Sequence, residues 1–402
     1  MKLTKETVSL LVIAILATAG MVVVGTFINV FLIRATAGNL SLIIIQNMVA
    51  FISGWIAFVT GTKLLKKTSV TTLLKFGLLL MIAYLAIVLA LQAHLATFLI
   101  PIAFFNGFGG GLYWFSINLL IAGIIKEQEQ GRYFGYQQTT GSILGVITPT
   151  ISGFIITRFT DLTGYYILFA IALFFYLFSL YMTKNIPKFT SSTDIRLSEV
   201  LKLKGNRYFN AGKSFRFIIA LRDTINGQVF MLYAFLIFNN EGIIGNILSA
   251  TAVIAIFSSF WFAKIYTRRN QQRFYLTVAI MKMTIYVLLA IFPYVPVLIG
   301  AWIVFAVIQN WAATVLQSVI FQLSSRAKGG FETNDYITAL EFPATVGRII
   351  GMGFALLMIQ LIPSVLLVYR LLFVVIAIAW ILEYVVIEKQ VGWFRDEFTS
   401  SG

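Results

Sequence analysis

Long apolar runs alternate with short polar breaks along almost the whole chain. A first set of runs, each long enough to cross hydrocarbon as a helix, covers residues 8–33, 40–61, 76–92, 95–125, 134–157 and 164–183. A second set covers residues 217–240, 243–263, 274–292, 295–323, 335–361 and 364–387. The runs are apolar on all sides and lack the alternation of a transmembrane β-strand. The pattern predicts an all-α polytopic membrane protein with twelve transmembrane helices.

One polar segment, residues 184–216, interrupts this pattern. It holds eight lysines or arginines together with Ser191 and Ser192, so it cannot span a bilayer. We expect four regions: an N-terminal six-helix bundle over 1–183, a cytoplasmic central linker over 184–216, a C-terminal six-helix bundle over 217–390 and a cytoplasmic tail over 391–402.

The two predicted bundles are related by a weak internal repeat at an offset near 200 residues. A basic loop at 63–67 follows the second run, and a basic loop at 264–273 follows the eighth. At an offset of 203, Tyr133 at the start of the fifth run corresponds to Tyr336 at the start of the eleventh. Two related bundles that face each other would leave a cleft between them.

The placement of lysine and arginine predicts the orientation in the membrane. If the N-terminus is cytoplasmic, 24 of the 30 lysines and arginines fall on the cytoplasmic side, and only Arg34, Arg158 and Arg370 fall on the other. We therefore expect both termini to be cytoplasmic. The net charge of +15 then reflects topology and contact with anionic head groups, so the expected partners are membrane lipids and not nucleic acid.

Composition removes several classes of function. With 59% apolar and only 11% charged residues, the chain is not a water-soluble globule. It has no cysteine and a single histidine, His94, so it can build neither a thiolate nor a histidine metal cage, nor a Ser-His-Asp triad. No phosphate-binding Gly-Lys-Ser/Thr motif is present, and the glycines within 107–111 are expected to serve helix packing. We predict that the chain is not an enzyme and needs no metal or cofactor.

Two motifs and the six-plus-six organisation carry a family resemblance. After the second run, Gly61, Lys66 and Lys67 keep the glycine and basic character of a known loop motif, with Leu65 in the place of its aspartate. In the fifth run a glycine or proline recurs every fourth residue, at Gly141, Gly145, Pro149 and Gly153. The chain resembles the major facilitator superfamily of secondary transporters, and the fifth run is similar to the glycine-proline motif of its drug and proton antiporters. The resemblance implies alternating access and a central cavity lined by the first, fourth, seventh and tenth runs.

Ionisable side chains inside apolar runs are costly and therefore candidates for function. Arg222 and Asp223 are adjacent in the seventh run, while Glu341 and Arg348 lie seven residues apart on one face of the eleventh. Asp223 or Glu341 could carry a coupling proton, because a buried carboxylate that gains and loses an arginine partner can titrate with conformation. The alternative is a static gate of ion pairs. Lys282, in the ninth run, is expected to snorkel or to face lipid.

The four runs that the resemblance places around the cavity all carry amides, with aromatic residues beside them. The candidate substrate-binding residues are Asn29, Asn106, Tyr113, Trp114, Asn118, Asn226, Gln309, Asn310, Trp311 and Gln317. Asn106, Trp114 and Asn118 follow one helical stripe. Each residue taken singly could instead form interhelical hydrogen bonds.

Together these features predict a secondary active transporter in a bacterial inner membrane. We expect a monomer that moves a small organic, amphiphilic solute by alternating access, with export coupled to proton entry preferred. The alternatives are nutrient uptake by proton symport or facilitated diffusion, a lipid or glycolipid flippase on the same fold, and a membrane scaffold that transports nothing.

Overall fold

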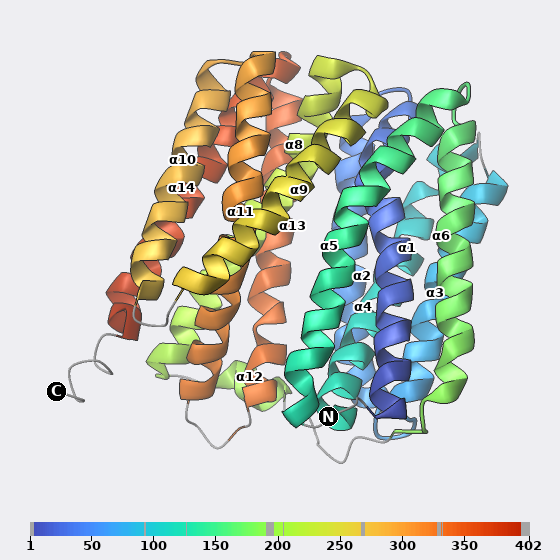
Figure 1. Cartoon of the computed structure of the whole chain (residues 1–402), viewed down its shortest axis with the longest axis vertical. Coiled ribbons are helices and arrows are strands. Elements are labelled where there is room, and N and C mark those ends of the chain that lie inside the picture. Colours follow the sequence, from blue (N-terminus) through green and yellow to red (C-terminus); the bar gives the residue numbers. More distant parts are fainter. Residues whose placement is uncertain are drawn as a thin grey trace. The chain divides into compact units, whose positions relative to one another are not determined.

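The computed structural model describes residues 4–91, 94–125, 127–189, 197–203, 205–266, 270–327, 331 and 333–394. Within these ranges the chain is helical and contains no strand (Figure 1). Helices satisfy their backbone hydrogen bonds internally, as a segment in hydrocarbon must. The all-α class expected from the sequence is confirmed.

The helices follow one another with short connections. Their bounds are α1 (Lys5–Ala35), α2 (Leu40–Leu64), α3 (Val70–Leu91), α4 (Leu95–Ile124), α5 (Glu127–Arg158), α6 (Thr163–Met182), α7 (Leu197–Lys202), α8 (Arg207–Phe238), α9 (Glu241–Ile265), α10 (Gln271–Ile291), α11 (Val295–Arg326), α12 (Thr333–Ala339), α13 (Glu341–Leu361) and α14 (Val365–Val391). Polar residues cap several N-termini: the side chains of Thr4, Asn39 and Ser364 accept hydrogen bonds from backbone N–H groups in the first turns of α1, α2 and α14.

Eleven helical segments in the described residues are long and apolar enough to cross a membrane. α8 is not among them, and it carries Arg207, Lys213, Arg216, Arg222 and Asp223. α8 corresponds to the seventh predicted run. By length and composition, the structure therefore supports eleven of the twelve expected crossings.

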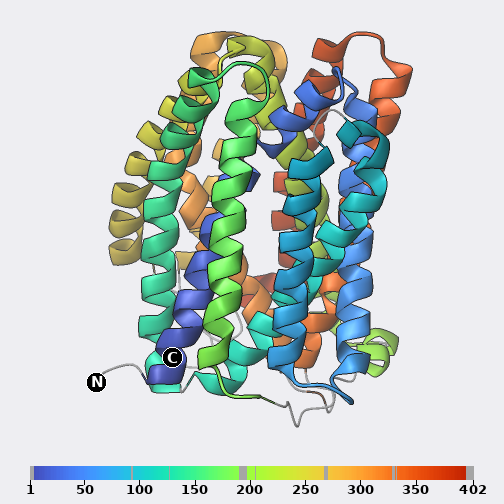
Figure 2. The ribbon, with the colours of Figure 1, turned by 90° about the vertical axis from the view of Figure 1, so that its right-hand side faces the viewer.

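The chain divides into two compact units. Unit 1 comprises Met1–Asp194 and Phe238–Ser249, and unit 2 comprises Ile195–Ile237 and Ala250–Gly402. In unit 1, α4 packs extensively against α2 and α3, and α1 packs against α5 and α6. These helices run along nearly the same direction (Figure 2).

Glycines allow the close approach of α4 to its neighbours in unit 1. A methyl group at Gly107 would overlap the backbone carbonyl of Ala50 on α2. One at Gly109 would lie 2.8 Å from Cβ of Leu80 on α3, whereas one at Gly110 would meet nothing within 4 Å. The glycine run therefore serves helix packing, as small residues do in membrane bundles.

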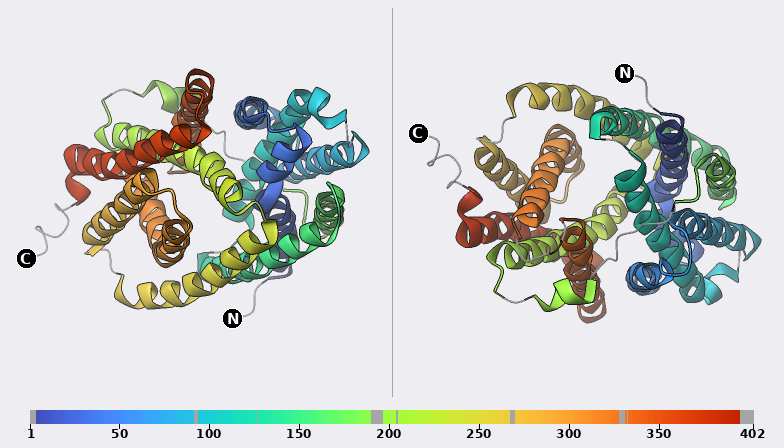
Figure 3. Two further views of the ribbon diagram at one scale, coloured as in Figure 1. Left: turned by 90° about the horizontal axis from the view of Figure 1, so that it is seen from above. Right: turned by 90° about the horizontal axis from the view of Figure 1, so that it is seen from below.

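In unit 2, α10 packs against α14 and α11, as the views along the helices illustrate (Figure 3). The short helix α12 packs against α7 and α11. The predicted run 335–361 is divided at Leu340 into α12 and α13. α8 begins at Arg207, before the expected start at 217, because a helix can continue past the apolar segment that would cross hydrocarbon.

The segment predicted as the central linker is partly helical, and its first residues are hydrogen-bonded to the start of α3. After a 3-10 turn at Thr183–Asn185, the backbone oxygen of Phe189 accepts a hydrogen bond from Val70 N at 2.9 Å, at the start of α3. Thr71 Oγ1 donates to the oxygen of Pro187 at 3.0 Å. Residues 190–196 and 204 of the linker, and 395–402 of the tail, lie outside the described residues.

Candidate functional site

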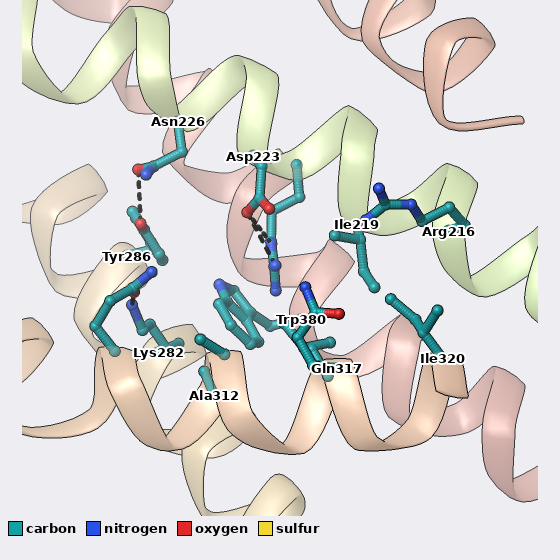
Figure 4. A pocket seen from close by; sticks show the side chains of 14 residues that line it. Arg216, Ile219, Asp223, Asn226, Lys282, Tyr286, Ala312, Gln317, Ile320 and Trp380 are labelled. Atoms are coloured by element: carbon teal, nitrogen blue, oxygen red, sulfur yellow. Dashed lines mark hydrogen bonds and ion pairs between the residues drawn. The ribbon is translucent and has the colours of Figure 1, made fainter. Parts of the chain in front are cut away.

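A cavity of about 180 Å³ lies inside unit 2, among α8, α10, α11 and α14 (Figure 4). Its lining residues are Arg216, Ile219, Arg222, Asp223 and Asn226 from α8, Lys282 and Tyr286 from α10, Gln309, Ala312, Ala313, Leu316, Gln317 and Ile320 from α11, and Trp380 from α14. We call it the unit 2 pocket. It combines charged groups, amides and apolar walls, and several of its members are candidates that the sequence singled out.

Helical spacing explains why α8 contributes so many polar groups to one wall. Arg216, Ile219, Asp223 and Asn226 recur at intervals of three or four residues, so their side chains share one face. In Figure 4 they project from α8 toward the facing wall made by α11. Asn226 Oδ1 accepts a hydrogen bond from the hydroxyl of Tyr286 at 2.7 Å, which joins α8 to α10.

Arg222 is the centre of a buried ionic cluster. Its side chain is 2% exposed, and Nη1 donates to Glu383 Oε2 on α14 at 2.9 Å. Nη2 lies 2.9 Å from Oδ1 of Asp223, and the guanidinium lies 3.4 Å from the ring centre of Trp380. Glu383 is fully buried and also accepts a hydrogen bond from the Tyr275 hydroxyl. The expected Arg222–Asp223 pair is therefore part of a larger network across three helices.

Asp223 is the open end of this cluster. Its side chain is 60% exposed, while those of Arg222 and Glu383 are almost completely enclosed. The arrangement leaves one carboxylate at the surface of the unit 2 pocket and keeps the other fixed behind it. Of the two, only Asp223 lines the pocket.

The expectation that Lys282 snorkels or faces lipid is wrong. Its side chain is 3% exposed and lines the unit 2 pocket. Nζ donates to Gln309 Oε1 at 2.6 Å and lies 4.2 Å from the ring centre of Phe305 and 5.3 Å from that of Trp380. The physical reason is that α10 packs between α14 and α11, so the face that carries Lys282 is turned inward.

Glu341 forms a second ionic group at the start of α13. Oε1 accepts a short hydrogen bond from Arg216 Nη2, and Oε2 lies 3.4 Å from Nη1 of Arg348. The seven-residue separation of Glu341 and Arg348 is thus bridged by side chains that lean together. Since Arg216 also lines the unit 2 pocket, this group is connected to it.

The candidates on α11 point in two directions. Gln309 and Gln317 line the unit 2 pocket. Asn310 instead donates through Nδ2 to Ser259 Oγ on α9 at 2.6 Å, and Trp311 Nε1 donates to the Ser258 oxygen at 3.3 Å. Asn310 and Trp311 therefore hold α9 and do not line this cavity.

The candidates in unit 1 are likewise divided. Asn106 on α4 is half-buried, and Trp114 and Asn118 on the same stripe are exposed at the surface of the unit. Tyr113 is 2% exposed and packs in the core, so it contributes to packing and not to that stripe. Asn29 on α1 accepts a hydrogen bond from Asn47 Nδ2 on α2 at 3.5 Å, which agrees with the alternative of interhelical bonding.

Unit 1 also contains an ionic group that was not predicted from the sequence. Arg34, in the last turn of α1, lies with Nη2 2.7 Å from Oε1 of Glu241, the first residue of α9. The Tyr165 hydroxyl of α6 donates to the same oxygen at 2.6 Å. Close backbone packing accompanies it, because a methyl group at Gly153 of α5 would lie 2.7 Å from the oxygen of Glu241. We call Arg34, Glu241 and Tyr165 the α1–α9 latch.

Glu383 and Glu241 could have been identified from the sequence as candidate functional residues. Glu383 is an acidic residue within the last apolar run, and Glu241 lies between the seventh and eighth runs. Their arginine partners are 161 and 207 residues away in sequence, so only the fold identifies the pairs.

The described residues contain no group of three or more His, Cys, Asp or Glu side chains that could hold a metal ion. The carboxylates named above are instead bonded to arginines, which compete with a cation for the same oxygens.

A sequence profile of the Major Facilitator Superfamily matches residues 10–330, which is most of the chain. The chain belongs to this superfamily. The family agrees with the expectation of a transporter rather than an enzyme, and the resemblance to the superfamily is confirmed.

Relatives of this superfamily member are distant in sequence. It is 24% identical over 275 residues to an uncharacterized protein of Bacillus subtilis, YqgE, and the match spans 66% of this chain but only 61% of that relative. A second match, 24% identical over 144 residues, is to an uncharacterized protein of Geobacillus stearothermophilus and covers 36% of this chain and 67% of the relative.

Solved structures of transporters share the fold. A bacterial homologue of the iron transporter ferroportin matches with a TM-score of 0.70 at 14% identity, covering 97% of this chain and 99% of that one. A D-xylose-proton symporter matches with a TM-score of 0.69 at 14% identity, covering 94% and 96%. At these identities the likeness establishes the fold and leaves substrate to be argued from this chain's own residues.

Proposed function

We propose that this chain is a secondary active transporter that moves a small organic, amphiphilic solute by alternating access. The observation that carries the proposal is the unit 2 pocket, in which charged and amide side chains from four helices surround a cavity. Ionisable groups within membrane-spanning helices are costly and usually mark a substrate or ion pathway. A scaffold with no transport function would have no need of a polar cavity of this kind.

We further propose twelve crossings, with α8 as the seventh, in the cell membrane of a bacterium. The two bundles predicted over 1–183 and 217–390 would form the two halves, with the linker, the tail and both termini cytoplasmic. The distribution of lysine and arginine supports this orientation. The protein is proposed to act as a monomer.

The proposed coupling residues are Asp223 and Glu341, with Arg222 and Arg348 as their partners. Asp223 is open to the pocket, while Glu341 is held between Arg216 and Arg348. A carboxylate that loses its arginine when the halves move would take up a proton and release it when the pair reforms. We propose that this exchange drives export against proton entry.

The α1–α9 latch is proposed to close the side opposite the cytoplasm. Arg34 lies at the C-terminal end of α1, which the charge distribution assigns to that side. The latch joins α1 and α6 to the first turn of α9, so opening of that side would require Arg34 and Glu241 to separate.

Counterflow in proteoliposomes tests the transport proposal. A solute that raises the midpoint of thermal unfolding of the purified protein is first selected from a panel of drugs, sugars, peptides and lipid head groups, because only binding to the folded state stabilises it. We expect exchange of the labelled solute in wild type. We expect its loss in Gln317→Ala and in Asn118→Ala, with unchanged yield of folded protein. Exchange that continues in both variants would contradict the assigned sites, and the absence of any exchange would contradict transport.

The coupling proposal is tested with Asp223→Asn and Glu341→Gln in the same vesicles. We expect one of these variants to lose accumulation driven by a pH gradient while it retains exchange, because the neutral side chain cannot release a proton. Unchanged accumulation in both variants would reject these two carboxylates as coupling residues.

A further inference from the structure

One of the three cations that line the unit 2 pocket, Lys282, forms no ion pair within the described residues. The ionic side chains that line the pocket are Arg216, Arg222, Lys282 and Asp223, while Glu341 pairs with Arg216 and with Arg348, and Glu383 pairs with Arg222. Arg222 is paired with two of the carboxylates, and Arg216 and Arg348 share the third. In the described part of the chain, Lys282 makes no ion pair.

The direct contacts of Lys282 are neutral groups that suit a cation. Its polar partner is the amide oxygen of Gln309, and the rings of Phe305 and Trp380 lie beside it. A cation buried without a counter-ion is unfavourable, and a nearby anion removes most of that cost. An acidic group placed beside Lys282 would therefore be stabilising.

The cavity next to Lys282 can accept that charge. Lys282 and Gln309 both line the cavity, so a group bound there lies within reach of the ammonium. Figure 4 places Lys282, Tyr286 and Asn226 at one end of the pocket, and Ile219 and Ile320 at the other, beside Arg216, which is paired with Glu341. A ligand with one charged and one apolar end would match this division.

The volume limits the size of the bound group. The cavity volume of about 180 Å³ is below the roughly 300–1,000 Å³ that is typical of sites for drug-sized ligands. The pocket therefore fits a short chain or a single ring with its acidic group, or the acidic end of a larger molecule.

We propose that the substrate is an organic anion whose carboxylate, or an equivalent acidic group, pairs with Lys282 while its apolar part contacts Ile219 and Ile320. This inference rests on the proposed transport function and names its substrate class. Arg222 does not take this role, because its charge is already paired with those of Asp223 and Glu383. Lys282 and Gln309 are specificity-determining residues of the site.

Isothermal titration calorimetry on the purified full chain tests the proposal with shape-matched probes. The probes are hexanoate and benzoate, the neutral amides hexanamide and benzamide, and the amines hexylamine and benzylamine. We expect at least one carboxylate to bind, with its amide and its amine at least about tenfold weaker, as expected when one charge-assisted hydrogen bond is lost. An amide or amine that binds as tightly as its carboxylate, or a panel in which neither carboxylate binds, would overturn the proposal.

Two variants locate the binding at Lys282. Lys282→Gln should weaken the carboxylate about 10- to 100-fold, while Lys389→Gln, an exposed lysine near the end of α14, should leave it unchanged. Gln309→Glu places a carboxylate where Lys282 already donates, so it should abolish binding of the probe without lowering the midpoint of thermal unfolding. That combination keeps the test decisive even if Lys282→Gln folds poorly. Carboxylate affinity unchanged in Gln309→Glu would refute the assignment.

The outcome is separable from that of the transport proposal. If counterflow is found for a neutral or cationic solute, the transport proposal stands and the anionic substrate class falls. If a carboxylate binds at Lys282 but no solute of the panel exchanges, the anion site stands and transport falls.

Discussion

The buried Arg222–Glu383 pair gives the sharpest prediction about stability. Glu383→Gln keeps the shape of the side chain but removes its charge, while Arg222 Nη1 and the Tyr275 hydroxyl still point at the same position. Both Arg222 and Glu383 are almost completely buried, so water cannot replace the lost interaction. We expect the variant to fold with a lower free energy of unfolding.

The size of the stability loss in Glu383→Gln depends on the interactions that Arg222 keeps. Removal of one partner from a buried ion pair costs about 3–5 kcal/mol when the remaining charge is left uncompensated. Here Arg222 keeps Asp223 at 2.9 Å and the face of Trp380 at 3.4 Å, so the loss approaches that of a single hydrogen bond to a charged group, about 2–3 kcal/mol.

The assay is denaturant unfolding in detergent micelles followed by tryptophan fluorescence. Glu388→Gln is the matched control, because Glu388 lies on the same helix, is only partly buried and accepts from Gln272 Nε2 at 3.1 Å, a bond that glutamine can keep. We expect the control to change stability by less than about 0.5 kcal/mol.

A double-mutant cycle with Arg222→Gln separates the pair from other effects. We expect the double variant Arg222→Gln, Glu383→Gln to lose less stability than the sum of the single variants. A Glu383→Gln variant as stable as wild type, or a cycle in which the losses simply add, would refute the account of a coupled buried pair.

Two further predictions concern unit 1. Gly107→Ala should destabilise the protein by about 1–3 kcal/mol in the same unfolding assay, because the methyl group overlaps the Ala50 carbonyl. The control Gly110→Ala, on the same helix, should be within about 0.5 kcal/mol of wild type. Equal effects of the two substitutions would contradict the packing role. In wild type, Ser249 on α9 donates to the Val146 oxygen of α5. Arg34→Gln should speed the labelling of a cysteine introduced at position 249, because the α1–α9 latch no longer holds α9. An unchanged labelling rate would show that the latch does not control access.

The positions of the helices could be predicted from the sequence because apolar run length is a property of each segment alone. The run 8–33 lies within α1 (Lys5–Ala35), and 364–387 matches α14 (Val365–Val391) closely. The polar helix α8 shows the limit of this reasoning, because Arg216 and Arg222 have carboxylate partners on α13 and α14 that the sequence of α8 does not reveal.

The direction of individual side chains was harder to predict than the helices themselves. Gln309 and Gln317 face the unit 2 pocket, whereas Asn310 and Trp311 face α9. An α-helix turns by about 100° per residue, so neighbours in sequence such as Gln309 and Asn310 cannot share a face. The periodicity could have separated these sets, but which set faces a cavity depends on the packing partners.

Lys282 illustrates the same limit for a charge. In isolation, a lysine near the end of an apolar run is best satisfied by snorkelling to the interface. Its true partners, Gln309 and the ring of Phe305, come from α11, and no local pattern links them to α10. Buried charge of this kind is recognised only once the helices are assembled.

Accessibility of the unit 2 pocket from each side of the membrane tests the central claim most directly. The chain has no cysteine, so Gln317→Cys introduces a single thiol at the pocket wall. Its labelling by a membrane-impermeant maleimide is measured in right-side-out and in inside-out vesicles, with Arg34 intact and with Arg34→Gln. Alternating access predicts labelling from both sides, with the non-cytoplasmic rate raised and the cytoplasmic rate lowered by Arg34→Gln. Labelling from one side alone in both backgrounds, or from neither side, would contradict the account.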